Sequence, residues 1–238
     1  MSHLLLVLLF AAETPPKADD LLKKYDAIMG AENFEAVAEM TAHRDDGSVR
    51  AYKMKVLKAG SEKLRIWFSE PAAVRGQEML RQGENLWVYL PNLKKPTRLA
   101  SRESFQGGDF NNADVLRVHY QADYDSRVLP SGTASSVPEA WELELKAKTS
   151  DAAYERVKLW MRRADGMPLK AEYYTASGKQ LRAAEFSEVK SFGGFKRPAR
   201  IVMKNMLTPK RWSEMVMTSF NVKVTPPAAR FVLDDLGR

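Results

Sequence analysis

The sequence predicts a mainly β fold: a curved, half-open antiparallel β-barrel of about a dozen strands, with one helix near its start and short helical segments. From Phe34 onward, apolar and polar residues alternate with a period of two, which is typical of strands with one buried face. Short turn sequences rich in Gly, Asp, Ser and Pro separate these runs. A meander of this length has to curl or close, because a flat sheet would leave long unpaired edges.

One domain is expected over residues 19–238, because no Gly/Ser/Pro-rich linker divides the middle of the chain and 45% of its residues are hydrophobic. Residues 1–18 are expected to form a signal peptide and leader. Leu4 to Ala12 is an unbroken apolar run, about as long as a signal-peptide core and too short to span a bilayer. An apolar strand or core helix fits less well, because Glu13-Thr-Pro-Pro-Lys follows at once. Cleavage after Ala12 or Ala18 would release the mature chain.

A helix is expected from Asp19 to about Gly30. Asp19 and Asp20 suit its positive amino end, and Gly30 is a natural stop. The apolar residues of this segment recur at three- and four-residue spacing and form one face: Leu21, Leu22, Tyr25, Ile28 and Met29.

Turn sequences then divide the chain into strands. Asp45-Asp-Gly-Ser is a strong hairpin turn, Pro71 and Pro91 end apolar runs, and Gly193-Gly194 makes a further turn. The expected strands are residues 34–44, 49–58, 63–69, 75–81, 86–90, 97–100, 123–129, 139–148, 154–163, 169–175, 179–189, 198–207 and 211–224.

The end of the chain predicts two further features. The last strand changes the parity of its apolar residues between Met217 and Phe220, which indicates a bulge or a strong bend. Pro226-Pro227 ends the sheet, and the apolar tail from Phe231 to Leu236 could pack back on it.

The middle of the chain is its most distinctive stretch. A strand from Leu86 to Leu90 ends at a proline, and Lys94-Lys95-Pro96 is expected at a polar hairpin tip. Phe105-Gln-Gly-Gly-Asp-Phe then holds a glycine bend between two aromatic anchors. Asn111 or Asn112 can cap a short helix after it.

This stretch resembles a family of outer-membrane lipoprotein-sorting proteins, periplasmic relatives of the lipoprotein carrier LolA. The resemblance rests on Trp87-Val-Tyr-Leu-Pro, a basic turn, and Ser104-Phe-Gln-Gly-Gly-Asp-Phe-Asn-Asn-Ala-Asp. Phe68-Ser-Glu-Pro, Arg75-Gly-Gln-Glu-Met-Leu and the terminal Phe231-Val-Leu-Asp-Asp-Leu fit the same pattern. It spans nearly all of the chain after the leader. The resemblance implies a half-open barrel, a first helix leaning on the open side of the curved sheet, and a periplasmic location.

Enzyme chemistry is not expected. The chain has no cysteine, which excludes disulfides, thiol catalysis and zinc–thiolate sites, and its three histidines are scattered. No metal-protease, nucleophile-elbow, phosphate-loop or dinucleotide motif occurs. Asp109 and Asp114 could be imagined as a metal pair, but turn and capping roles explain them more simply. The sequence predicts no metal, no cofactor and no catalytic residue.

The net charge of +7 would suit nucleic acid or an anionic membrane surface. The basic residues, however, stand in pairs at expected turns, whereas nucleic-acid binders concentrate them on one helix or stripe. These pairs are therefore expected on a solvated surface, and anionic lipid headgroups are the favoured phosphate-bearing partner. The pairs are Lys94-Lys95, Arg162-Arg163, Lys196-Arg197 and Lys210-Arg211.

The resemblance favours a cavity inside the barrel over an ordinary filled core, although periodicity alone leaves both open. A barrel not filled by side chains could enclose an acyl chain, and flexible methionines, of which the chain has eleven, suit chains of varied shape. The expected lining residues are Leu64, Ile66, Phe68, Val88, Leu143, Leu145, Leu159 and Met161.

The implied mechanism is transfer of acyl chains of lipoproteins or phospholipids toward the outer membrane, with only transient membrane contact. The first helix and a lid would move aside to admit the chain. The lid residues are Phe105, Gly107, Gly108, Asp109 and Phe110, and headgroup phosphates are expected to meet Lys94, Lys95 and Arg98. A transporter of the resistance-nodulation-division type is a possible partner. The alternatives are a partner-binding or sensor module associated with an inner-membrane transporter, or an enzyme on the same fold.

Overall fold

The computed structural model describes residues 15–130, 137–150 and 152–238. Most of the predicted signal peptide, residues 1–14, lies outside the described residues, and Ala18 is the first residue of helix α1. Within these described ranges, no helix is both long and apolar enough to cross a membrane.

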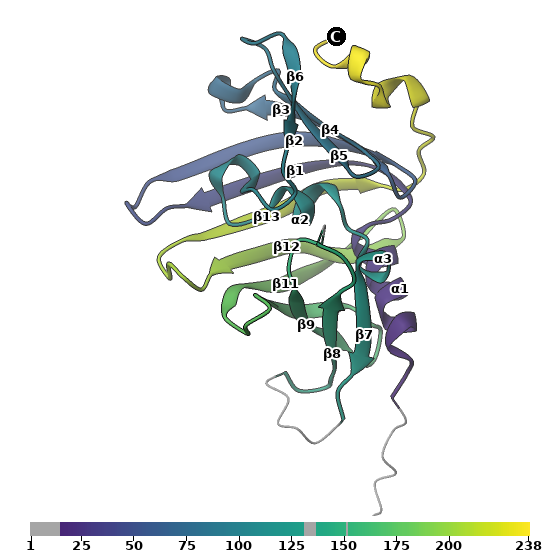
Figure 1. Ribbon diagram of the computed structural model, residues 1–238. Coiled ribbons are helices and arrows are strands. Elements are labelled where there is room, and N and C mark those ends of the chain that lie inside the picture. Colours follow the sequence, from purple (N-terminus) through teal and green to yellow (C-terminus); the bar gives the residue numbers. More distant parts are fainter. Residues whose placement is uncertain (1–14, 131–136, 151) are drawn as a thin grey trace, which may run out of the picture.

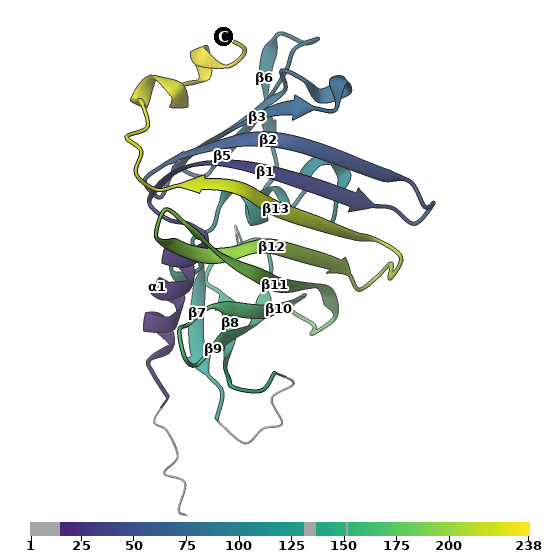
Figure 2. The same ribbon diagram turned by 180° about the vertical axis from the view of Figure 1, so that it is seen from behind.

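Thirteen strands of the described chain form one antiparallel sheet, which curves without closing (Figures 1 and 2). The strands are β1 Asn33–His43, β2 Val49–Ala59, β3 Lys63–Glu70, β4 Glu78–Gln82, β5 Asn85–Leu90, β6 Lys95–Leu99, β7 Tyr124–Val128, β8 Ala140–Ala147, β9 Arg156–Arg162, β10 Pro168–Tyr174, β11 Gln180–Phe192, β12 Phe195–Asn205 and β13 Trp212–Asn221. Their order across the sheet is β6-β5-β4-β3-β2-β1-β13-β12-β11-β10-β9-β8-β7. The predicted half-open antiparallel sheet is confirmed.

The sheet consists of two meanders that meet where β1 pairs with β13. Met40 lies opposite Met215 in this pairing, and the register shifts between Val37 and Ala38, opposite Thr218. The shift is the bulge that the change of parity in the last strand predicted. Strands β6 and β7 are left as the two edges of the sheet.

Helix α1, Ala18–Met29, packs against β7, β12 and a short helix α3, Tyr120–Asp123. Its buried face is the predicted one: Leu21, Leu22, Tyr25, Ile28 and Met29. We call the end of the sheet at which β1 begins and β2 ends, at Asn33 and Ala59, the helix end, because α1 runs into it. The opposite end of the strands is the far end.

Residues 100–123 cross the concave side of the sheet, and we call them the inserted segment (Figure 1). The segment contains a 3₁₀ turn at Phe105–Gly107, the helix α2 at Asn112–Leu116, and α3. Four of its apolar side chains are buried in the main core together with α1 and the inner faces of the strands: Phe105, Phe110, Leu116 and Tyr120. The concave side of the sheet is therefore filled by the protein itself.

A second, smaller core lies on the other face of the sheet. The chain after β13 turns back over this face in two 3₁₀ turns, Ala228–Phe231 and Leu233–Asp235. Phe231 and Leu236 pack there against Leu57 and Leu80. The tail packs back on the sheet, as its apolar residues predicted.

Candidate functional site

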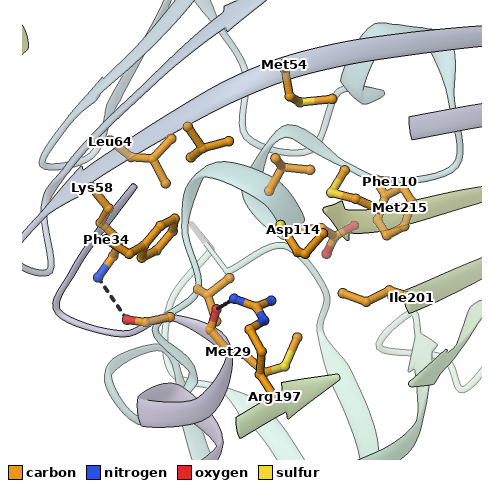
Figure 3. A pocket seen from close by; sticks show the side chains of 15 residues that line it. Met29, Phe34, Met54, Lys58, Leu64, Phe110, Asp114, Arg197, Ile201 and Met215 are labelled. Atoms are coloured by element: carbon orange, nitrogen blue, oxygen red, sulfur yellow. Dashed lines mark hydrogen bonds between the residues drawn. The ribbon is translucent and has the colours of Figure 1, made fainter. Parts of the chain in front are cut away.

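A pocket lies between the concave face of the sheet and the inserted segment, close to the end of α1 (Figure 3). Its volume is about 60 Å³, which leaves room for a few water molecules. Sites for small organic ligands usually measure about 300–1,000 Å³. The lining residues are Met29, Gly30, Phe34, Met54, Val56, Lys58, Leu64, Phe110, Asp114, Val115, Val118, Arg197, Ile201, Met215 and Met217.

Four methionines give the pocket wall its adaptable part. They come from three parts of the fold: the end of α1, the middle of β2, and β13, which supplies two. Thioether side chains have three rotatable bonds and repack at low cost, so a wall made from them can change shape. The four are Met29, Met54, Met215 and Met217.

Lys58 is a buried cation in this pocket, at the end of β2. Its Nζ donates hydrogen bonds to the carbonyl oxygens of Gly30 and Ala31 at 2.9 and 2.8 Å, just after α1 ends. Only 5% of Lys58 is exposed. Burial lowers the pKa of Lys58 to about 8, and the nearby Arg81 charge adds to the shift. Among the described residues, no carboxylate forms an ion pair with this lysine.

Arg197 is the second buried cation, near the start of β12, and is 2% exposed. Its guanidinium lies over the ring of Phe220 at 4.4 Å. Nε donates to the Pro198 carbonyl at 3.3 Å, and Nη1 donates to the Met29 carbonyl at 3.5 Å, both at the long limit for such bonds. Burial lowers the pKa of Arg197 to about 10. In the described part of the chain, no carboxylate lies within ion-pair distance of it and no acceptor binds Nη2.

Asp114 is the one acidic residue among the lining residues, and it is already satisfied. Its Oδ2 accepts a hydrogen bond from the Asn111 backbone N–H at 2.7 Å, at the start of α2, and one from the Tyr154 hydroxyl at 2.8 Å. Burial raises the pKa of Asp114, and the charge of Arg182 opposes that rise. The carboxylate is thus engaged away from Arg197, and Figure 3 draws the two side chains apart.

A few specific contacts hold the glycine bend of the inserted segment against the sheet. Ser213 of β13 accepts a hydrogen bond from the Asp109 N–H and donates one to Asp109 Oδ2, both at 2.9 Å. The Tyr52 hydroxyl donates to the Gln106 carbonyl at 3.1 Å. Gly107 has a φ of +71°, a left-handed conformation that favours glycine. Gly108 lies so close to β13 that an added Cβ would be 3.0 Å from Ser213 Oγ.

The predicted lid residues therefore lie inside the concave side of the sheet, where Phe105 and Phe110 are buried. The five are Phe105, Gly107, Gly108, Asp109 and Phe110. Of the predicted lining residues, Leu64 lines the pocket. The other seven are buried in the same continuous core and do not line it: Ile66, Phe68, Val88, Leu143, Leu145, Leu159 and Met161. Their contact with a cargo stays a prediction.

The predicted headgroup residues Lys94, Lys95 and Arg98 are all exposed. Lys95 is paired with Leu90 at the far end of the strands, whereas the pocket reaches the helix end. Arg98 stacks on the ring of Trp87 at 5.2 Å. The three side chains are not brought together with the pocket, and their contact with a membrane stays a prediction.

Sequence reasoning missed that the two cations of the pocket, Lys58 and Arg197, are buried. Lys196-Arg197 was expected on a solvated surface, but only Lys196 is exposed. The burial of Lys58 was indicated by the alternation of apolar and polar residues in β2, since Lys58 falls on the same face as the buried Met54 and Val56. A basic residue at an apolar parity indicates either a satisfied structural charge or a ligand contact.

Comparison with known proteins agrees with this architecture. A family model described as an uncharacterized protein matches residues 60–238. A LolA superfamily protein from Nitrosomonas europaea has a solved structure that superposes with a TM-score of 0.82, is 27% identical, and aligns over 92% of this chain and 99% of its own. The chain belongs to the family of this model and is a LolA-like protein.

Two further solved structures share the fold of this LolA-like protein. A putative outer membrane lipoprotein-sorting protein domain from Vibrio parahaemolyticus has a TM-score of 0.77 at 21% identity, covering 93% of this chain and 98% of its own. A DUF1329 family protein from Desulfovibrio piger has a TM-score of 0.81 at 21% identity, covering 92% and 97%. No curated protein matches the sequence. Within the described residues, no three His, Cys, Asp or Glu side chains are grouped to hold a metal ion.

Proposed function

We propose that this LolA-like protein is a non-catalytic carrier that takes up acyl chains of lipoproteins or lipids inside its curved sheet and passes them toward the outer membrane. The observation that carries the proposal is the methionine-lined pocket beneath the inserted segment, on the concave side of an unclosed sheet. Both the fold and the family support a role in lipoprotein sorting. A periplasmic location follows from this role.

Uptake would exchange the protein's own packing for that of the cargo. At about 60 Å³ the pocket is too small for a long acyl chain, so the inserted segment has to move. Phe105 and Phe110 would give up their buried positions, and the cargo would bury its methylenes in their place at about 0.8 kcal/mol each. Because the two burials offset each other, the net affinity stays modest and the cargo can be released.

The glycine bend is suited to this movement. It is held by the Asp109–Ser213 pair and by the bond from Tyr52 to Gln106, and hydrogen bonds of this kind contribute about 0.5–1.5 kcal/mol each. The three bonds together contribute about 1.5–4.5 kcal/mol, which is comparable to the burial of a single phenylalanine at about 1.5–3 kcal/mol. Opening of the segment therefore has to break these polar contacts as well as exchange apolar packing.

The second candidate is a partner-binding or sensor protein associated with an inner-membrane transporter. The small volume of the pocket favours it, because a closed, well-packed interior needs no cargo. A transporter of the resistance-nodulation-division type remains a predicted partner for either candidate.

Native mass spectrometry of protein purified from periplasm without detergent, followed by organic extraction, tests the proposal. A carrier is expected to co-purify with phospholipid or a triacylated peptide, or to bind such lipids when they are added. Failure to bind any added lipid would refute it, and a stable protein partner without lipid would favour the second candidate.

A further inference from the structure

We propose that Arg197, supported by Lys58, binds the anionic headgroup, a carboxylate or a phosphate, of a single amphiphile whose acyl chain lies among the methionines of the pocket. This inference rests on the proposed function and narrows its cargo. The headgroup site is inside the sheet at its helix end rather than at the exposed basic turn of Lys94 and Lys95.

The first step of the argument is the state of Arg197. A buried charge is ordinarily paired with an opposite charge or fully hydrogen-bonded, because its removal from water is costly. Arg197 has two long hydrogen bonds to carbonyls, one aromatic neighbour, and no ion pair within the described chain. No acceptor among the described residues binds its Nη2, which can therefore donate to a ligand. A guanidinium binds carboxylates and phosphates in a two-pronged geometry.

The second step is the positive charge of Lys58, which is held close to the end of α1. Its ammonium is held by backbone carbonyls after α1, so its position is fixed. No carboxylate of the described residues forms an ion pair with it, although the charges of Glu32 and Asp26 partly oppose the lowering of its pKa. Lys58 and Arg197 lie on the same side of the pocket as Met29 (Figure 3). Burial lowers the pKa values of both, which means that the protein disfavours their charged forms. An anion bound beside them would relieve that penalty.

The third step is the arrangement of charge and apolar surface. Asp114 does not neutralise the two cations, since its carboxylate is occupied by Asn111 and Tyr154. Away from the cations the pocket is lined by Met54, Ile201 and other apolar side chains. A cationic side and an apolar remainder match a molecule with one anionic head and one chain. The uncharged acyl anchor of a triacylated cysteine does not offer this match.

Binding of two pairs of amphiphiles to delipidated protein tests the inference. Each pair shares the same monounsaturated hydrocarbon chain and differs in charge: oleate against oleyl alcohol for the carboxylate, and oleoyl lysophosphatidate against mono-oleoylglycerol for the phosphate. Radiolabelled probes below their micelle concentrations are followed by equilibrium dialysis. The wild-type protein is compared with Arg197→Met, with the charge-preserving Arg197→Lys, and with Lys94→Gln/Lys95→Gln as the matched loss of positive charge at the far end.

The wild-type protein is expected to bind at least one anionic probe about 10- to 100-fold more tightly than its neutral counterpart, as the loss of one charge-assisted contact implies. The pair of probes in which the anionic member binds more tightly identifies the headgroup as carboxylate or phosphate. Arg197→Met should abolish the preference, Arg197→Lys should keep part of it, and Lys94→Gln/Lys95→Gln should keep all of it.

Several results would overturn the inference. Equal binding of anionic and neutral probes by the wild-type protein, or an unchanged preference in folded Arg197→Met, removes the headgroup site but leaves the carrier proposal standing. Loss of preference in Lys94→Gln/Lys95→Gln would move the site to the far end. If the wild-type protein binds none of the four probes, the headgroup site is refuted, whereas the carrier proposal is refuted only if added phospholipid and triacylated peptide also fail to bind.

Discussion

A disulfide between positions 108 and 213 should lock the inserted segment onto the sheet. A Cβ added at Gly108 would lie 3.0 Å from Ser213 Oγ. A disulfide places the Cβ of one cysteine at about this distance from the sulfur of the other, since one sulfur separates them across bonds of roughly 2 Å. Gly108 has an extended backbone with a φ of −84°, so a side chain is tolerated. The chain has no cysteine of its own, so the engineered pair would be its only thiols.

The size of the effect follows from the loop that the bond closes. Positions 108 and 213 are roughly 100 residues apart, which corresponds to a chain-entropy stabilisation of about 4–5 kcal/mol. For a protein of this size that is an increase in Tm of about 10 °C on oxidation. The reduced form of Gly108→Cys/Ser213→Cys is the control, because it has already lost the Ser213–Asp109 hydrogen bonds.

The assay is the rate at which the protein takes up a fluorescent fatty acid, 12-NBD-stearate, before and after oxidation with glutathione disulfide. The oxidised form is expected to take up the probe at least about tenfold more slowly, and dithiothreitol should restore the rate. Each single cysteine variant should be insensitive to oxidant. A locked protein, shown by mass and raised Tm to contain the disulfide, that takes up the probe at the rate of its reduced form would refute movement of the segment at Gly108.

Three further predictions concern stability and are measured by urea unfolding. Arg65 is fully buried and donates to Glu78 and to the Asp235 carbonyl, so Arg65→Met should lower the free energy of unfolding by about 3–5 kcal/mol because it leaves the Glu78 carboxylate uncompensated. Arg65→Met/Glu78→Leu should recover part of that loss, and no recovery would contradict the explanation. Lys58 has a folded-state pKa of about 8, below its ordinary 10.5, so between these values the unfolded chain binds a proton that the folded chain does not. The free energy of unfolding should therefore rise from pH 8 to pH 10 more in the wild-type protein than in Lys58→Met, and an equal rise would show that Lys58 is not shifted. Leu143→Ala removes a fully buried side chain and should lower stability by about 2–5 kcal/mol, while leaving fatty-acid binding intact if Leu143 is core rather than lining; weakened binding at unchanged stability would reverse that assignment.

The strands could be predicted from the sequence because most of them bury one face, so that burial imposes a period of two. Trp141, Leu143 and Leu145 are buried as their alternation predicted.

Several bounds of the predicted strands differ. β6 already begins at Lys95, within the predicted hairpin tip, because Lys95 pairs with Leu90. β11 and β12 continue to Phe192 and from Phe195, because the turn between them is only Gly193-Gly194. Residues 72–74 form a 3₁₀ turn and β4 begins at Glu78 rather than at Arg75, since Gly76 adopts a φ of +80° there.

Helix α3 could not be predicted, because its first turn depends on a distant residue. The carboxylate of Asp26 in α1 accepts hydrogen bonds from the backbone N–H groups of Tyr120 and Gln121 at 2.8 and 2.9 Å. Nothing in the local sequence from Tyr120 to Asp123 indicates this contact. The helix forms where tertiary structure supplies the partner for its free N–H groups.

The candidate site was predictable only in its general character. Apolar faces and abundant methionines indicated an apolar interior, and Met215 and Met217 do line the pocket. Which apolar residues leave space between them depends on how the inserted segment packs, and that packing involves residues far apart in the chain. Arg197 follows an exposed lysine near a turn, so its burial becomes visible only when β12 is paired with its neighbours.

The pairing of β1 with β13 makes the assembly of this sheet depend on the end of the chain. Glu35 pairs with Asn221, which lies more than three quarters of the chain length away in sequence. Until the last strand arrives, β1 presents an open row of backbone groups to any other strand, which is the condition under which chains associate wrongly. Contacts of such high sequence separation also form slowly. A chain shortened before residue 212 would lack the strand that joins its two halves, and its first six strands would be left with an unprotected edge.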